Sequence, residues 1–125
     1  MSGTILLIDD NAIQAATRQA ILRRAGHSVV TASDPAQVLQ QVQNDAFSDN
    51  LALIITDHIM PAMNGSEFVR RLRERHLELP VMVISGLDDA EAEYEGLNVL
   101  FRLKPLHPDN LLASVEKLLG ANKEA

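Results

Sequence analysis

Polar side chains that can do chemistry lie at or just beyond the ends of four of the short apolar runs in this sequence. They are Asp9, Asp10, Asp57, Ser85 and Lys104. Carboxyl groups that lie close together raise one another's pKa unless a cation lies among them. A hard divalent ion such as Mg²⁺ or Mn²⁺ suits oxygen ligands, and no histidine or cysteine cluster indicates a softer metal. The set predicts an oxygen-lined cation site with an ammonium group and a hydroxyl nearby.

The elements that must position these residues are short runs with apolar side chains at consecutive positions. The runs are residues 4–8, 28–31, 52–56, 81–84 and 99–102. Consecutive apolar residues are typical of strands buried on both faces, as in a parallel sheet covered by helices. Ligands of such sheets bind beyond the carboxyl ends of the strands, which is where the polar residues fall.

Helical patterns separate the runs. The first predicted helix spans residues 12–25, and its apolar face consists of Ile13, Ala16, Ala20 and Ile21. The others begin near Pro35, Asn64, Asp88 and His107, and the last is expected to stop near Gly120. The one near Asp88 is short and polar, so we expect it to be short or irregular. Five strand–helix pairs in this order predict a doubly wound α/β fold, with a five-stranded parallel sheet and helices on both faces.

Each polar residue also has an ordinary structural interpretation. Asp9 and Asp10 suit a helix N-cap, Asp57 suits a turn, and Ser85-Gly86 is a common turn sequence. Lys104-Pro105 suits a bend at the exit of a strand. Their coincidence at one edge of the predicted sheet favours a functional site over four unrelated structural roles.

Length and composition set outer limits. The chain has 125 residues, a net charge of −6 and no cysteine. We therefore expect a single domain over residues 1–125, with a core from about 4 to 119 and a tail from 121 to 125, in a reducing cytoplasm. The sequence has no run that predicts a membrane span and no signal-peptide pattern. The negative charge and the 3% aromatic content argue against direct nucleic-acid binding.

From Thr4 to Leu119 the sequence resembles the response-regulator receiver family. The resemblance is carried by Asp9-Asp10, residues 57–65 (Asp-His-Ile-Met-Pro-Ala-Met-Asn-Gly), Ser85-Gly86 and Lys104-Pro105. It implies a flavodoxin-like sheet with strand order 2-1-3-4-5 and a phosphoacceptor function in two-component signal transduction. The donor would be a histidine kinase or a histidine phosphotransfer protein, and a downstream protein would bind the switched surface.

The resemblance also implies roles for individual residues. Asp57 would accept the phosphoryl group, Asp10 would bind Mg²⁺ directly, and Asp9 would act mainly through water. The backbone carbonyl of Ile59 would complete the protein ligands. Lys104 would pair with Asp57 and then with the phosphoryl oxygens. These roles agree with the chemistry of phosphoryl transfer, which needs an in-line nucleophile and cations that neutralise oxygen charge.

Further residues are implied in switching. Ser85 would hydrogen-bond the phosphoryl group, and the small Gly86 would leave a path for the donor. The bond from Lys104 to Pro105 is expected to be cis. Phe101 would turn inward on activation, or it is an ordinary half-buried aromatic residue of the last strand.

Two apolar residues stand where hydrolysis of a phosphoryl group would need a polar side chain. Ile59 and Leu87 would flank the phosphoryl group, and neither side chain can orient an attacking water, so we predict a long-lived phosphoryl group. His58 would shade the site or sense pH, although partial burial in its loop is the commoner outcome. The segment between Ser85 and Lys104 is two or three residues shorter than in most relatives, as expected for an irregular fourth helix.

The arginines of two predicted helices offer surfaces for an acidic partner, or they are simply solvated. They are Arg18, Arg23, Arg24, Arg70, Arg71, Arg73 and Arg75. Other interpretations are a receiver cut from a hybrid kinase or larger regulator and a non-phosphorylated binding module. An aspartate-dependent phosphohydrolase would want a second aspartate close behind Asp57, where Ile59 stands. We therefore expect no enzyme activity beyond the chain's own phosphorylation and dephosphorylation.

Overall fold

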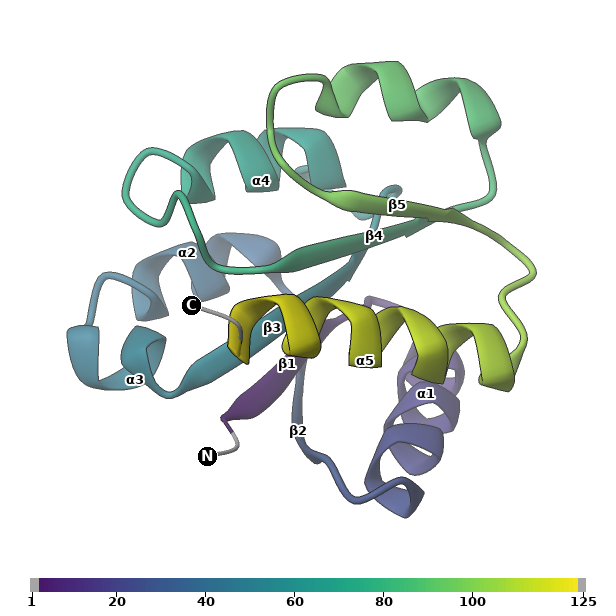
Figure 1. Ribbon diagram of the computed structural model, residues 1–125. Helices are drawn as coiled ribbons and strands as arrows, with labels where there is room; N and C mark the ends of the chain where they lie inside the picture. The colour runs from purple at the N-terminus through teal and green to yellow at the C-terminus, as the bar shows by residue number, and fades with distance from the viewer. Residues whose placement is uncertain (1–2, 124–125) are drawn as a thin grey trace.

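The fold is built on a five-stranded parallel sheet with strand order β2-β1-β3-β4-β5 (Figure 1). The computed structural model describes the backbone of residues 3–123 and the side chains of residues 3–120. The strands are β1 (Thr4–Ile8), β2 (Ser28–Ala32), β3 (Leu51–Asp57), β4 (Val81–Ser85) and β5 (Leu100–Leu103). The predicted fold class and strand order are confirmed.

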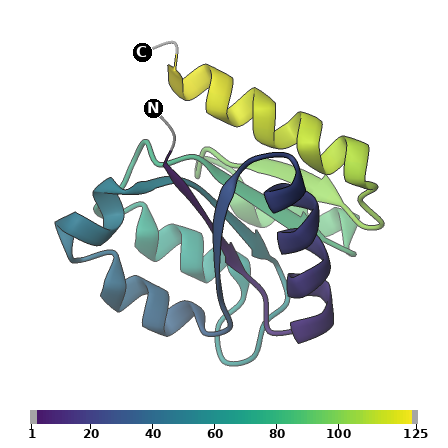
Figure 2. The same cartoon turned by 90° about the horizontal axis from the view of Figure 1, so that it is seen from below.

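Helices cover both faces of the sheet (Figures 1 and 2). They are α1 (Ala12–Arg24), α2 (Pro35–Gln41), α3 (Asp45–Asp49), α4 (Gly65–Leu72), the 3₁₀ helix η1 (Asp88–Tyr94) and α5 (Pro108–Lys123). One apolar core lies between the sheet and α1 with α5, and the other lies between the sheet and α2, α4 and η1. None of the helices in the described part of the chain has both the length and the apolar character needed to cross a bilayer.

The two cores explain the consecutive apolar residues of the strands. In β1, Ile5 and Leu7 contribute to the core under α1 and α5, whereas Leu6 and Ile8 contribute to the opposite core. Successive side chains of a strand point to opposite faces, so a strand covered on both sides needs apolar residues at every position. Strands β1, β3 and β4 are accordingly buried almost throughout.

Polar caps fix where the helices begin. The Asn11 side chain accepts a hydrogen bond from the backbone N–H of Gln14, and Asn64 accepts one from Glu67. Helix α2 starts as predicted, with Asp34 as the N-cap and Pro35 in the first turn. Because α1 begins directly after the acidic pair, its first two turns lie beside the carboxyl end of the sheet.

Two sequence predictions about helices are wrong, and one short helix was missed. Ile13 does not face the core but is 81% exposed, and the buried residues of α1 are Ala15, Arg18 and Leu22. The short helix α3 was not predicted at all. Helix α5 continues to Lys123 instead of stopping near Gly120. The last two residues of the predicted tail, 124 and 125, lie outside the described residues.

The segment between β4 and β5 is irregular, as predicted. It forms a single 3₁₀ stretch, η1, with no side-chain hydrogen bond at its N-cap. Its acidic residues are exposed, and Ala90 and Tyr94 are its buried anchors. With so few apolar residues, the segment cannot cover the sheet as a regular amphipathic helix would.

Candidate functional site

Three carboxylates meet at the carboxyl edge of the sheet, as the sequence predicts. Asp9 follows β1, and Asp57 ends β3, and both side chains are almost fully buried. Asp10 is exposed at the start of the following loop. Each of the three offers an oxygen atom, and these oxygens lie within 4.8 Å of one another. The cluster is an all-oxygen donor set of the kind that hard divalent cations bind.

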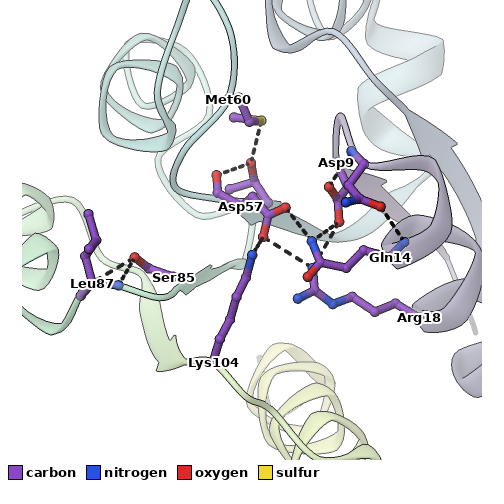
Figure 3. A network of polar contacts seen from close by, with 10 residues as sticks. Asp9, Gln14, Arg18, Asp57, Met60, Ser85, Leu87 and Lys104 are labelled. Atoms are coloured by element: carbon purple, nitrogen blue, oxygen red, sulfur yellow. Dashed lines mark hydrogen bonds and ion pairs between the residues drawn. The ribbon is translucent and has the colours of Figure 1, made fainter.

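Lys104 lies on the other side of Asp57. Its Nζ atom is 3.2 Å from Asp57 Oδ1, and Figure 3 shows the side chain reaching up from the end of β5. The backbone N–H of Lys104 donates to the carbonyl of Ser85 at 2.8 Å, which fixes the strand end next to β4. The peptide bond from Lys104 to Pro105 is cis, as expected.

Two residues of α1 that the sequence analysis did not assign to the site also enter it. Gln14 Nε2 donates to Asp9 Oδ2 at 2.8 Å and to Asp57 Oδ2 at 3.0 Å. Arg18 Nη1 is 3.2 Å from Asp9 Oδ2 and 3.3 Å from Asp57 Oδ1. Figure 3 shows both side chains converging on the two carboxylates. The sequence analysis offered Arg18 as part of a surface for an acidic partner. The structure instead places it inside the site.

One sequence signal pointed to these two residues. Gln14 and Arg18 are four positions apart in a helix that begins directly after the acidic pair, so they share the face above Asp9. The apolar periodicity of the same helix gave a competing choice of face, with Ile13 and Ala16 inward. That choice fails because the inward face of the helix's first half is polar.

The pKa of Asp57 is raised from its ordinary value of 3.8 to about 6, chiefly because burial disfavours the charged carboxylate. The neighbouring Asp9 carboxyl contributes to this rise, whereas the charges of Arg18 and Lys104 oppose it. The Asp57 carboxylate thus lies where burial and Asp9 disfavour a negative charge, and the positive charges of Arg18 and Lys104 partly offset this effect.

The predicted switch residues lie apart from the carboxylates. The Ser85 hydroxyl accepts a hydrogen bond from the backbone N–H of Leu87 at 2.9 Å and lies 3.3 Å from the carbonyl of Leu87. Phe101 is half-buried and packs against Tyr94, with 5.9 Å between the ring centroids. In this state the Ser85 hydroxyl is therefore engaged within its own loop.

Four of the residues predicted to flank the site are exposed to solvent. Ile59 is 64% exposed and Leu87 is 46% exposed. Gly86 and Pro105 are exposed as well, and a Cβ atom at Gly86 would meet nothing within 4 Å. The exposed side chains of Ile59 and Leu87 are apolar, and that they flank a phosphoryl group stays a prediction.

His58, the residue after Asp57, is 4% exposed and so is buried more completely than the partial burial given as the commoner expectation. Its Nδ1 atom shares a 2.6 Å hydrogen bond with the hydroxyl of Tyr94, and its Nε2 atom lies 3.6 Å from Glu93 Oε2. Ser66 donates to the other oxygen of Glu93 at 2.9 Å. The sequence analysis did not identify Tyr94, because nothing around a lone tyrosine in a polar segment indicates a hydrogen bond to a residue 36 positions earlier.

Gly65 permits this arrangement. A Cβ atom there would lie 2.8 Å from the Asp57 carbonyl oxygen and 3.1 Å from the Cα atom of His58, and it would collide with the Tyr94 hydroxyl. The Gly65 N–H donates to the His58 carbonyl at 2.6 Å. The start of α4 can approach the site loop this closely because residue 65 has no side chain.

A family model for the response regulator receiver domain matches residues 5–116, and the chain belongs to this family. It is 30% identical over 119 residues, 93% of its length, to the transcriptional regulatory protein ZraR of Escherichia coli K12, and the match covers 26% of that protein. It is 35% identical over 96 residues to the gliding motility regulatory protein of Myxococcus xanthus, which covers 75% of this chain and 12% of that protein. The chain thus spans about a quarter or less of these relatives.

Solved structures give the same answer for the fold. The chemotaxis response regulator CheY4 of Vibrio cholerae superimposes with a TM-score of 0.81 and 27% identity, over 95% of this chain and all of that one. A response regulator receiver domain protein from Clostridium thermocellum reaches a TM-score of 0.87 over 97% of both chains, and at 22% identity it supports the fold alone. The chain is a receiver domain of the two-component response regulator type.

Proposed function

We propose that Asp57 accepts a phosphoryl group from a phosphohistidine donor and that the modified domain switches a protein-binding surface. The observation that carries this proposal is the pairing of Asp57 with Lys104 at 3.2 Å, inside a cluster of three carboxylates at the carboxyl edge of the sheet. A carboxylate placed this way is a poor structural residue, because burial beside like charge is costly. It is a suitable nucleophile for phosphoryl transfer.

In the proposed reaction an Asp57 carboxylate oxygen attacks phosphorus in line with the bond to the donor imidazole. The new O–P bond forms, the P–N bond breaks, and the imidazole leaves with its electron pair and takes up a proton. Lys104 supplies positive charge next to the attacking oxygen. Gly86, which is exposed and has no side chain, would leave a path for the donor side chain.

The oxygen donors fit a hard divalent ion. Asp9, Asp10, Asp57 and the backbone carbonyl of Ile59 would hold Mg²⁺ or Mn²⁺, and the bound ion would supply positive charge to the phosphoryl oxygens. The choice of a hard ion over a softer metal is supported by the cluster itself. Each of its three carboxylates offers an oxygen atom, and hard cations prefer oxygen ligands.

Switching would begin at Ser85. A phosphoryl group on Asp57 presents new acceptor oxygens, so the Ser85 hydroxyl would exchange its loop contact at Leu87 for one with the phosphoryl group. The loop before η1 would move with it, and Phe101 and Tyr94, which pack together, would repack. The altered surface over η1 and β5 would be read by a downstream protein.

The partners follow from the same chemistry. A histidine kinase or a histidine phosphotransfer protein would be the donor, in the cytoplasm, and the domain would catalyse no more than its own phosphorylation and dephosphorylation. The relatives span many more residues than this chain, so a place within a hybrid kinase or larger regulator is part of the proposal. Arg70, Arg71 and Arg75 remain exposed for an acidic partner.

The direct test is intact-mass analysis after incubation with acetyl phosphate, with Mg²⁺ and with EDTA. Wild type should gain one phosphoryl group with Mg²⁺, and Asp57→Asn should gain none. Asp45→Asn, which changes an exposed aspartate of α3, is the matched control and should label like wild type. Equal labelling of Asp57→Asn, or no labelling of wild type, would overturn the proposal in favour of a non-phosphorylated binding module.

A further inference from the structure

The carboxylate oxygens of Asp9 and Asp57 already have protein partners. Asp9 Oδ1 accepts from the backbone N–H of Asn11 at 2.9 Å, and Asp9 Oδ2 accepts from Gln14 and Arg18. Asp57 Oδ1 contacts Arg18 and Lys104, and Asp57 Oδ2 accepts from Gln14. All four oxygens of this buried pair are engaged by side chains or backbone of the chain itself.

The charges of the buried pair are balanced as well. Two carboxylates face one guanidinium and one ammonium, so these four side chains sum to zero when all are ionised. Buried carboxylates crowded together ordinarily need an added cation to offset their repulsion. Here Arg18 supplies that cation from within the chain.

Arg18 is held in this position by the fold. Its side chain is only 11% exposed, and it lies in α1 between Ala15 and Leu22, which are buried against the sheet. The Asn11 cap fixes the first turn of the same helix. A guanidinium carried on a packed helix loses less entropy on binding carboxylates than one carried on a mobile loop.

We propose that Arg18, assisted by Gln14, is an internal counter-ion that occupies the carboxylates of the metal-free domain, and that a divalent cation binds by displacing it. The inference rests on the proposed function, since it concerns the same cation site. A divalent ion that took ligands from Asp9 and Asp57 would need oxygens that Arg18 and Gln14 now hold. The two positive charges would also repel each other at such short range.

The first test is metal affinity, measured by titrating Mg²⁺ and then Mn²⁺ into the metal-free protein by calorimetry. Arg18→Met keeps the length and helix propensity of the side chain but removes the charge. We expect it to bind Mg²⁺ at least about tenfold more tightly than wild type. Arg24→Met removes an equal charge from an exposed position of the same helix and should leave the affinity within about twofold.

The second test is stability with and without metal. In EDTA, Arg18→Met should melt at a lower temperature than wild type, because Asp9 and Asp57 lose a buried partner. Mg²⁺ should restore much of the loss, so the metal-induced rise in Tm should be larger in Arg18→Met than in wild type or Arg24→Met. A purely structural role for Arg18 would lower both melting temperatures and leave the metal-induced rise unchanged.

Two measurements serve if Arg18→Met fails to fold without metal. Arg18→Lys keeps the charge but has a shorter side chain and lacks the guanidinium Nη1 atom that contacts both carboxylates, so it should bind Mg²⁺ with intermediate affinity. In wild type, the Arg18 side-chain Nε–H resonance should shift during a Mg²⁺ titration while that of Arg24 stays fixed.

Unchanged or weaker Mg²⁺ affinity in both Arg18 variants, or an Arg18 resonance that ignores the metal, would overturn the counter-ion proposal. The outcome is separate from that of the phosphoryl-transfer proposal, because affinity, Tm and the resonance need no phosphodonor. Tight metal binding in Arg18→Met without Asp57 labelling would support the counter-ion and sink the phosphoacceptor. Labelling of Asp57, together with equal Mg²⁺ affinities of wild type and Arg18→Met, would support the phosphoacceptor and overturn the counter-ion.

Discussion

At the scale of single residues, the environment of Asp57 differs strongly from that of a free side chain. It is buried, it lies next to another carboxyl group, and it faces two cations from different elements. The protein thus places a negative charge where it is costly and keeps positive charge in reach, which is how sites for charge-developing reactions are commonly built.

The raised pKa of Asp57 predicts a pH dependence of stability in the metal-free protein. The folded state binds this proton more tightly than the unfolded chain, since the pKa is about 6 when folded and 3.8 otherwise. The contribution of Asp57 to stability is therefore present at low pH and is lost as the pH rises through this window. The free energy of unfolding of wild type relative to Asp57→Asn should fall by on the order of 2 kcal/mol between about pH 4 and 7.

Urea denaturation in EDTA at several pH values would measure this difference. Asp45→Asn, compared with wild type in the same way, should give a nearly flat curve. A difference between wild type and Asp57→Asn that stays constant or grows with pH would contradict the assignment.

The exposed apolar side chain of Ile59 predicts a long-lived phosphoryl group. Neither Ile59 nor Leu87 can hold a water molecule in line with the phosphoryl bond, because neither has a polar atom. Decay of labelled wild type, followed by mass after removal of the donor, should take minutes or longer. Ile59→Asn should decay several-fold faster, whereas Leu77→Asn, at another exposed apolar position, should decay like wild type. Decay within seconds, or equal rates in wild type and Ile59→Asn, would show that this interpretation is wrong.

At the scale of elements, the strands were predictable and the inward face of α1 was not. The strands are read easily because burial on both sides demands apolar residues such as Ile5, Leu6 and Leu7 at every position. Helix α1 instead turns Gln14 and Arg18 toward the site, so hydrophobic periodicity favoured the wrong face. The electrostatic demand of Asp9 and Asp57 outweighs the gain from burying Ile13, and this demand appears only once the strand ends are assembled.

The 3₁₀ helix η1 predicts weak protection of its amides from exchange. It has no capping side chain, its acidic residues face solvent, and Ala90 and Tyr94 are its buried anchors. Hydrogen exchange should be on the order of 100-fold faster over residues 91–96 than over β4, whose residues are all buried. Helix α4, which packs beside η1, is the internal control and should show protection closer to that of β4. Protection of η1 equal to that of β4 would contradict the prediction.

At the scale of the whole molecule, positively charged side chains have different partners at the two ends of the strands. The carboxyl edge holds cations paired with carboxylates, whereas the opposite side of the fold holds Arg73, whose guanidinium donates to backbone carbonyls. These belong to His76, Leu79, Leu97 and Asn98. Sequence reasoning placed Arg73 in a solvated arginine face, because carbonyl partners leave no trace in the pattern of side chains.

Arg73→Met should therefore lower the global free energy of unfolding by about 3 kcal/mol, because four partly buried carbonyls lose their donor. The loss should appear in urea denaturation, while labelling at Asp57 stays complete because the site lies at the other end of α4. Arg75→Met, at an exposed neighbouring position, should change stability by less than about 0.5 kcal/mol. Loss of labelling in folded Arg73→Met would mean that the two ends are coupled.

The contact between Tyr94 and His58 gives the molecule a built-in optical probe. The sequence has one tyrosine and no tryptophan, so its ultraviolet emission comes from a ring that is hydrogen-bonded to the residue next to Asp57. Changes at the aspartate that reach His58 would be visible as changes in the brightness of that ring. The wild-type protein could then be followed in real time, without a dye or a label.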